Sequence, residues 1–160
     1  MAVAFRQIAP GDNTALATII RRTLQDYDAV REGTVYYDES TDYLYELFRK
    51  AGSVYLVAEE NGIILGGGGV FPTDGHDAAT CELVKMYLSA AGRGRGIGRQ
   101  LLEHCIDFAR SEGYTQMYLE SMPELHHAIK LYDKMGFTRL SAPLGQSGHY
   151  GCGIWMIRNL

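Results

Sequence analysis

Cysteine is scarce in this sequence, and its three copies lie far apart. Cys81, Cys105 and Cys152 show neither a Cys-x-x-Cys spacing nor a neighbouring run of histidines. An odd number of scattered cysteines is typical of reduced thiols, not of a disulfide framework or a structural zinc site. We therefore expect no metal ion, and we expect a reducing, cytoplasmic location.

Long apolar segments and strong basic charge are also missing. The sequence has no run of 18 consecutive apolar residues, and its N-terminus lacks the apolar stretch of a signal peptide. The formal net charge is −4, and the one cluster of arginines is short. Because affinity for nucleic-acid phosphates depends on clustered Lys and Arg, we expect neither a nucleic acid nor a membrane as the partner.

What the sequence does have is the composition of a globular domain. Its 160 residues are 46% hydrophobic and 21% charged, and a chain of this length buries about 70% of its unfolded surface on folding. No repeat, linker or low-complexity stretch divides it. We therefore expect a single domain over residues 1–160.

Residue periodicity separates an antiparallel first half from an alternating second half. The predicted strands are 2–8, 54–58, 63–65, 81–88, 116–120, a segment from 137, and 150–158; the predicted helices are a segment through 16–24, then 41–50, 96–110 and 122–135. Ser121 and Glu124 have the spacing of a capping box for the last helix, with Pro123 in its first turn. The expected fold is α/β, one mixed sheet of about six or seven strands with about four helices on its two faces.

The glycine-rich turn before the helix 96–110 is the most informative segment. Glycine occupies every second position from 92 to 98, with arginines at 93, 95 and 99. Glycines allow close approach of the backbone, and the first turn of a helix presents unpaired N–H groups to an anion such as a pyrophosphate. Neither a P-loop nor a dinucleotide fingerprint fits, because no Gly-Lys-Ser/Thr triplet follows and the Gly-x-Gly-x-x-Gly spacing fails.

Two motifs in this half resemble those of a known family. Arg93-x-x-Gly96-x-Gly98 is similar to the Gln/Arg-x-x-Gly-x-Gly/Ala signature of the GNAT N-acetyltransferases and stands, as it does there, between a strand and a helix. The segment AIKLYDKMGF at 128–137 is similar to that family's Ala-x-x-Leu-Tyr-x-x-x-Gly-Phe. Two motifs in the right order make the resemblance specific, and it implies the GNAT acyl-CoA N-acyltransferase fold.

The resemblance implies acetyl-CoA as the co-substrate. Backbone pairing with its pantetheine arm, in the manner of an added strand, would involve Met86, Tyr87 and Leu88. The residues whose N–H groups would hold its pyrophosphate form one continuous segment. They are Arg93, Gly94, Arg95, Gly96, Ile97, Gly98 and Arg99.

Acyl transfer to an amine also requires proton transfers. An alkyl amine has a pKa of about 10.4, so a base must take its proton near neutral pH, and the departing thiolate is stabilised by a proton donor. The resemblance implies Tyr132 as the donor, and Glu82 as the base because it stands eleven residues before Arg93, like the catalytic glutamate of histone acetyltransferases. Alternatively, Tyr132 is a core residue with a satisfied hydroxyl, and Glu82 forms a salt bridge with Lys85 or is exposed on the sheet.

The acceptor is expected beside an acidic segment. Residues 26–46 contain seven carboxylates against one arginine, together with five tyrosines, and in GNAT proteins this region borders the acceptor site. Carboxylates and aromatic faces suit a cationic primary amine, with Tyr37, Asp38 and Asp42 as candidate binding residues. A solvated acidic loop is the alternative interpretation.

Two further questions stay open at this point. The expected activity is direct attack of a primary amine, from a small molecule or a protein, on acetyl-CoA in a ternary complex, and the alternative is a non-catalytic acyl-CoA sensor of the same fold. A homodimer through the C-terminal strands is a second expectation, because such dimers are common in these folds. The run of four glycines at 66–69 predicts either a β-bulge or a close approach of a ligand or backbone.

Overall fold

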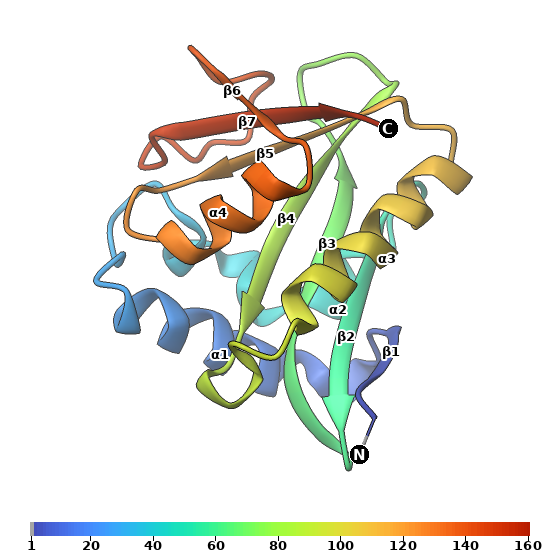
Figure 1. Ribbon diagram of the computed structural model, residues 1–160, viewed down its shortest axis with the longest axis vertical. Helices are drawn as coiled ribbons and strands as arrows, with labels where there is room; N and C mark the ends of the chain where they lie inside the picture. Colours follow the sequence, from blue (N-terminus) through green and yellow to red (C-terminus); the bar gives the residue numbers. More distant parts are fainter. Residues whose placement is uncertain (1) are drawn as a thin grey trace.

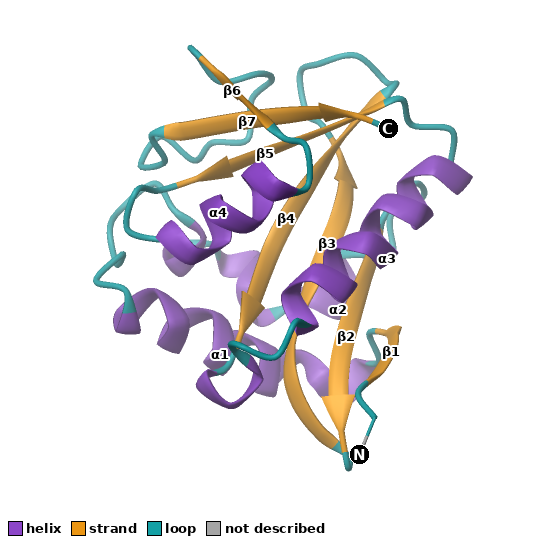
Figure 2. Cartoon of the chain, viewed as in Figure 1, coloured by secondary structure: helices purple, strands orange, loops and turns teal. Residues whose placement is uncertain are grey.

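One mixed sheet forms the centre of the molecule, as the computed structural model shows for residues 2–160 (Figures 1 and 2). Its strand order is β1-β2-β3-β4-β5-β7-β6, and β4 with β5 is its parallel pair. The strands are β1 (Ala4–Gln7), β2 (Val54–Glu60), β3 (Ile63–Pro72), β4 (Thr80–Leu88), β5 (Gln116–Ser121), β6 (Thr138–Leu140) and β7 (Ile154–Asn159). The predicted mixed sheet and its antiparallel first half are confirmed.

Four α-helices cover the two faces of the sheet, in agreement with the predicted number (Figure 1). They are α1 (Asn13–Asp26), α2 (Leu44–Leu47), α3 (Ile97–Ser111) and α4 (His126–Lys134). Apolar residues of α1 and α2 form one buried cluster with β2, and those of α3 and α4 form another with β3, β4 and β5. Each helix thus buries its apolar stripe against one side of the sheet.

Two strands separate near the middle of the sheet. The pairing of β4 with β5 runs only from Thr80 and Gln116 to Glu82 and Tyr118. Beyond these residues the two strands diverge (Figure 2). The sheet therefore opens between β4 and β5, and the residues that follow Glu82 and Tyr118 border the gap.

A β-bulge bends β4 at this opening. The register of β3 and β4 shifts between Gly67 and Gly69, so Lys85 and Met86 together oppose Gly68. Lys85 has a φ of 51°, which is uncommon for a residue with a side chain. The bulge turns β4 away from its straight path at the point where it leaves β5.

The glycine run at 66–69 combines both predicted features. Besides the bulge, a Cβ on Gly66, whose φ is 149°, would lie 2.1 Å from the carbonyl oxygen of Tyr87. A Cβ on Gly67 would lie 2.5 Å from the ring of Tyr55. Side chains are absent here because the neighbouring strand and buried aromatic rings fill the space.

Two of the predicted helices are shorter in the structure. α4 begins at His126, so the predicted capping box of Ser121 and Glu124 is wrong. Ser121 still belongs to β5, and Pro123 disfavours helical backbone in the residue before it. The helix predicted over 41–50 is the single turn α2, which short 3₁₀ turns precede.

Candidate active site

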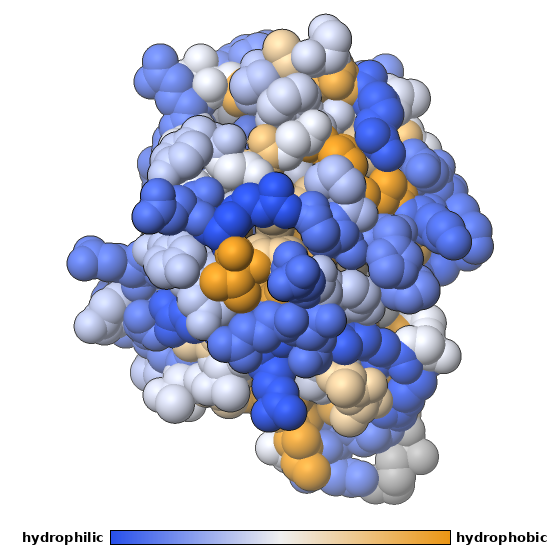
Figure 3. Space-filling view, turned by 90° about the vertical axis from the view of Figure 1, so that its left-hand side faces the viewer, coloured by the Kyte–Doolittle hydropathy of each residue, from blue (hydrophilic) through white to orange (hydrophobic). Residues whose placement is uncertain are grey.

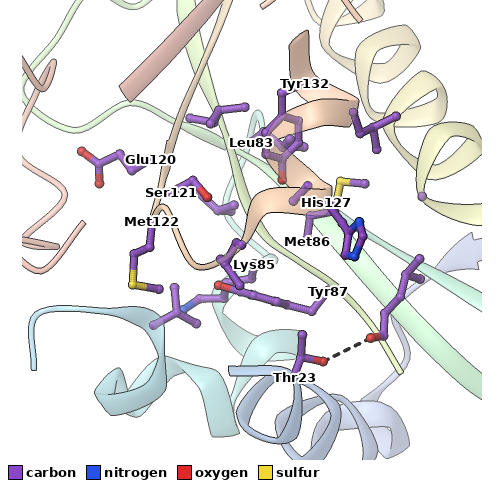
Figure 4. Close-up of a pocket in the computed structure, with 18 of the residues that line it drawn as sticks. Thr23, Leu83, Lys85, Met86, Tyr87, Glu120, Ser121, Met122, His127 and Tyr132 are labelled. Atoms are coloured by element: carbon purple, nitrogen blue, oxygen red, sulfur yellow. Dashed lines mark hydrogen bonds between the residues drawn. The ribbon is translucent and has the colours of Figure 1, made fainter. Parts of the chain in front are cut away.

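A cavity of about 650 Å³ lies where β4 and β5 separate (Figure 4). The diverging strands, the glycine-rich turn, α4 and the loop before β7 all contribute to its lining. Figure 3 views the side of the molecule where α1 ends and α4 begins, and shows apolar surface in a hollow framed by hydrophilic side chains. The predicted site residues can be placed relative to this cavity.

The glycine-rich turn forms one end of the cavity, at the N-terminus of α3. Gly94 and Gly96 have φ values of 73° and 76°, and a Cβ on either would meet no atom within 4 Å. These positions need glycine for their backbone conformation, and they leave the space in front of the helix N-terminus open. An anion can therefore approach the N–H groups of this turn.

Eight of the ten residues assigned to acetyl-CoA line the cavity. They are Met86, Tyr87, Leu88, Arg93, Gly94, Gly96, Gly98 and Arg99. Two are directed elsewhere: Arg95 forms an ion pair of 2.6 Å with Glu60, and Ile97 is 2% exposed in a small core cluster. Because α3 begins at Ile97, the side chain of this residue points into the core, while its backbone remains part of the glycine-rich turn.

The side chain of Arg93 joins the turn to α1. Its Nε donates to the carbonyl oxygen of Leu88 and its Nη2 to Oγ1 of Thr23, each at 3.1 Å. Its guanidinium also lies 5.2 Å from the ring centroid of Tyr27. The arginine therefore fixes the position of the glycine-rich turn as well as adding positive charge beside it.

Tyr132 extends from α4 into the cavity (Figure 4). The residue is 7% exposed, and its ring packs edge-on against Phe137 with centroids 5.8 Å apart. Burial raises the pKa of the hydroxyl above its ordinary value, so this group keeps its proton at neutral pH. A protonated hydroxyl that faces a cavity can donate a proton or a hydrogen bond to a ligand there.

Glu82 occupies the last position at which β4 pairs with β5. It lines the cavity and is 7% exposed. Burial raises its pKa to about 8, and the nearby carboxylates of Glu120 and Asp74 contribute to the rise. Neither alternative expectation holds, because Glu82 is not exposed and the ammonium of Lys85 donates instead to Asp38, at 2.9 Å.

The three candidate acceptor residues lie in different places. Asp38 bonds to Lys85 and, at 2.7 Å, to Nε2 of His149, and both of these partners line the cavity. The Asp42 carboxylate pairs with Arg21 at 2.6 Å, and this pair borders a separate surface depression. Tyr37 is 59% exposed. Of the three, Asp38 is the one that the fold connects to the cavity.

Several cavity residues were not identified from the sequence. Glu120 was detectable, because it is a carboxylate on a predicted core strand, which is the same signal that identified Glu82. His149 stands in a glycine- and serine-containing loop that follows no recognisable pattern. Its place beside Asp38 results from the path of the loop before β7, which local sequence does not specify.

Among residues 2–160, no group of three or more His, Cys, Asp or Glu side chains is arranged to hold a metal ion. Over the same residues, no helix has both the length and the apolar character needed to cross a bilayer.

Comparison with known proteins identifies one relative over nearly the whole chain and a second over about half of it. YjgM of Escherichia coli (strain K12), an uncharacterized N-acetyltransferase, is 36% identical over 156 residues, which cover 97% of this chain and 93% of that protein. N-acetyltransferase 8 of Rattus norvegicus is 33% identical over 90 residues, which cover 55% of this chain and 40% of that protein. The chain thus spans less than half the length of this second relative.

Solved structures share the fold at low sequence identity. A GNAT-family acetyltransferase of Staphylococcus aureus superposes with a TM-score of 0.84 at 18% identity and covers 99% of both chains. The yncA structure from Salmonella typhimurium, which contains its cofactor acetyl-CoA, has a TM-score of 0.79 at 24% identity and covers 100% of this chain and 95% of that one. The model of the acetyltransferase (GNAT) family matches residues 17–137. This chain therefore belongs to the GNAT acetyltransferase family.

Proposed function

We propose that the protein is an N-acetyltransferase, active as one domain over residues 1–160, that transfers the acetyl group of acetyl-CoA to a primary amine. The observation that carries this proposal is the meeting of Glu82 and Tyr132 in one cavity at the gap between β4 and β5. Glu82 comes from the sheet and Tyr132 from α4, so the two groups can act on different atoms of a bound substrate. A module that only senses acyl-CoA would need neither group.

The two residues divide the proton transfers between them. Acetyl-CoA supplies a thioester whose carbonyl carbon an amine nitrogen can attack directly in the ternary complex. Glu82 takes the proton of the amine, and its pKa of about 8 makes it a better proton acceptor than an ordinary carboxylate. Tyr132 donates a proton to the departing sulfur.

The site for the CoA part is proposed at the glycine-rich turn. Backbone N–H groups at the start of α3 would hold the pyrophosphate, and the diverging end of β4, from Met86 to Leu88, would pair with the pantetheine arm. The open gap beside β4 fits a strand-like ligand, because the backbone of β4 has no neighbour there on the β5 side. We infer no metal requirement for this chemistry.

Titration calorimetry with acetyl-CoA, CoA and ATP tests this site. The wild-type protein should bind both CoA species with micromolar affinity and ATP more weakly. Gly98→Asp should weaken acetyl-CoA binding on the order of 100-fold, because it adds a negative charge where the pyrophosphate is held. Gly98 has an ordinary helical backbone and lines the cavity, so the variant is expected to fold.

A matched control adds the same charge at the other end of α3. Ser111→Asp lies at the last residue of that helix and is exposed, so acetyl-CoA binding should stay within about twofold of wild type. Absence of acetyl-CoA binding by folded wild-type protein would refute the proposed function.

The acceptor is proposed to be a cationic primary amine. Glu120 and, through its contacts, Asp38 give the part of the cavity away from the glycine-rich turn an acidic character. Lys85 is its one buried ammonium within residues 2–160, and Asp38 already pairs with it. An amine that arrives with its proton is attracted to such a site.

Asparagine substitutions at Asp38 and Asp42 distinguish a residue that contributes to the acceptor site from one that lies outside the cavity. Asp38→Asn should raise the KM for the amine about tenfold, because it weakens the hold on Lys85 and His149, while acetyl-CoA affinity is retained. Asp42→Asn should leave both values unchanged, because Asp42 pairs with Arg21 outside the cavity. Steady-state kinetics measures both, and an equal effect of the two substitutions would contradict this assignment.

A further inference from the structure

A second carboxylate stands beside Glu82 in the cavity. Glu82 pairs with Tyr118 across the parallel strands, so Tyr118 and Glu120, two residues further on, lie on the same face of the sheet as Glu82. Glu120 lines the cavity together with Glu82, and Figure 4 shows Glu120 next to Ser121 on β5. The two carboxylates therefore face one space from neighbouring strands, at the point where these strands begin to diverge.

Glu120 is held in place from three sides. The hydroxyl of Tyr118 donates to its Oε2 at 2.7 Å, and the hydroxyl of Ser147 donates to its Oε1. Nδ1 of His149 lies 3.7 Å from the same Oε1, and the Glu120 side chain is only 4% exposed. Two of these partners come from the loop before β7, so that loop fixes the carboxylate against the cavity.

The other charged groups around Glu82 are either paired with an opposite charge or exposed to solvent. Lys85 on the same strand is paired with Asp38, which also bonds to His149 of the loop. Asp74, in the loop between β3 and β4, is exposed to solvent, which screens its charge. Within residues 2–160, the other groups near Glu82 that can ionise include the thiols of Cys81 and Cys152 and the hydroxyl of Tyr118. All three keep their protons at neutral pH, because burial raises their pKa.

We propose that Glu120 is a positioning residue of the acceptor site and acts on the reaction through Glu82. This inference rests on the proposed acetyl transfer to an amine. The neighbouring negative charge stabilises the protonated form of Glu82 and so raises the proton affinity of the base.

The raised proton affinity of Glu82 affects the transfer of one proton from the bound amine to this residue. When an ammonium group binds, its N–H bond breaks, the proton forms an O–H bond with the ionised Glu82, and the electron pair remains on nitrogen for attack. The transfer is less unfavourable to a base of pKa about 8 than to an ordinary carboxylate. Glu120 therefore brings the base closer to the amine in proton affinity.

The test is the pH dependence of kcat for Glu120→Gln, measured with one amine at saturating concentration. Glutamine keeps the size of the side chain and an oxygen that accepts hydrogen bonds, but it removes the charge. The midpoint at which kcat rises with pH should move down by about one pH unit. Near neutral pH the variant should be several-fold faster than wild type, and above the wild-type midpoint it should be slower, because its base is weaker.

Two comparison variants make this outcome decisive. Glu112→Gln, the same change at an exposed position beyond α3, should leave the profile where it is in wild type. Asp74→Asn should move the midpoint in the same direction as Glu120→Gln but by less, because Asp74 is exposed. Ionisation of the amine itself affects every profile equally and cancels in the comparison.

Crossing profiles for wild type and Glu120→Gln would support the inference, since a merely structural role lowers the rate at every pH. Profiles that superimpose after scaling would overturn it and leave the proposed activity intact. If wild-type protein acetylates no amine, the proposed function itself is wrong, and acetyl-CoA titration distinguishes that case.

Discussion

Glu82→Gln is expected to lower kcat at least about 100-fold and, at alkaline pH, to stabilise the protein. The loss of rate follows because glutamine cannot accept the proton of the amine. The gain in stability follows because Glu82 is 7% exposed and has a pKa raised to about 8, so an ionised carboxylate is unfavourable in the folded state. Activity and stability therefore change in opposite directions at one residue.

The pH window of the stability effect follows from the direction of the pKa shift. In wild type, the folded state binds the Glu82 proton more tightly than the unfolded state, so stability falls as pH rises from the ordinary glutamate pKa, 4.5, to about 8. Glutamine removes this fall, which amounts to a few kcal/mol, on the order of 1.4 kcal/mol per unit of pKa shift. Thermal unfolding at about pH 5 and about pH 9 measures it.

The exposed position Glu112 supplies the control for this experiment. Glu112→Gln should change neither kcat nor the difference in melting temperature between the two pH values. A Glu82→Gln variant with wild-type kcat would show that the base lies elsewhere. A variant that loses activity but is not stabilised at high pH would show that the ionised Glu82 carboxylate does not destabilise the folded protein.

The glycine-rich turn and the helix after it were predictable from the sequence, because their motifs are local. The turn at 92–99 depends on glycines whose positive φ values are intrinsic to the short segment, and the helix after it follows from its own periodicity. Tyr132 could likewise be assigned to a helix face that turns inward. Such features need no information about distant parts of the chain.

The acceptor side was not predictable to the same degree, because it is built from segments far apart in the sequence. Asp38 and His149 are 111 positions apart and meet only after β7 has added to the sheet beside β5. Composition identified residues 26–46 as acidic, but could not separate Asp38, which reaches the cavity, from Asp42, which pairs with Arg21 at the surface. That choice depends on the tertiary path of a segment with little regular structure.

Tyr132→Phe is expected to lower kcat by about 10- to 1,000-fold while the fold and the affinity for acetyl-CoA are retained. Phenylalanine keeps the ring that packs against Phe137, so the core of α4 is preserved. What is lost is the hydroxyl that α4 contributes to the cavity and that is proposed to protonate the departing sulfur. The slow hydrolysis of acetyl-CoA by the isolated protein should decrease with kcat, because it expels the same thiolate.

A second tyrosine of the same molecule gives the matched comparison. The hydroxyl of Tyr114 donates to the carbonyl oxygen of Gly52 at 2.8 Å and does not line the cavity. Tyr114→Phe should therefore lower the free energy of unfolding by about 1 kcal/mol and leave kcat unchanged. Tyr132→Phe should lower kcat and leave the free energy of unfolding nearly unchanged. If both variants lost stability and neither lost rate, Tyr132 would be a packing residue, and another group would have to protonate the sulfur. If the two effects separate as expected, proton donation is assigned to α4 and proton acceptance to β4, on the two sides of the gap that the diverging strands create.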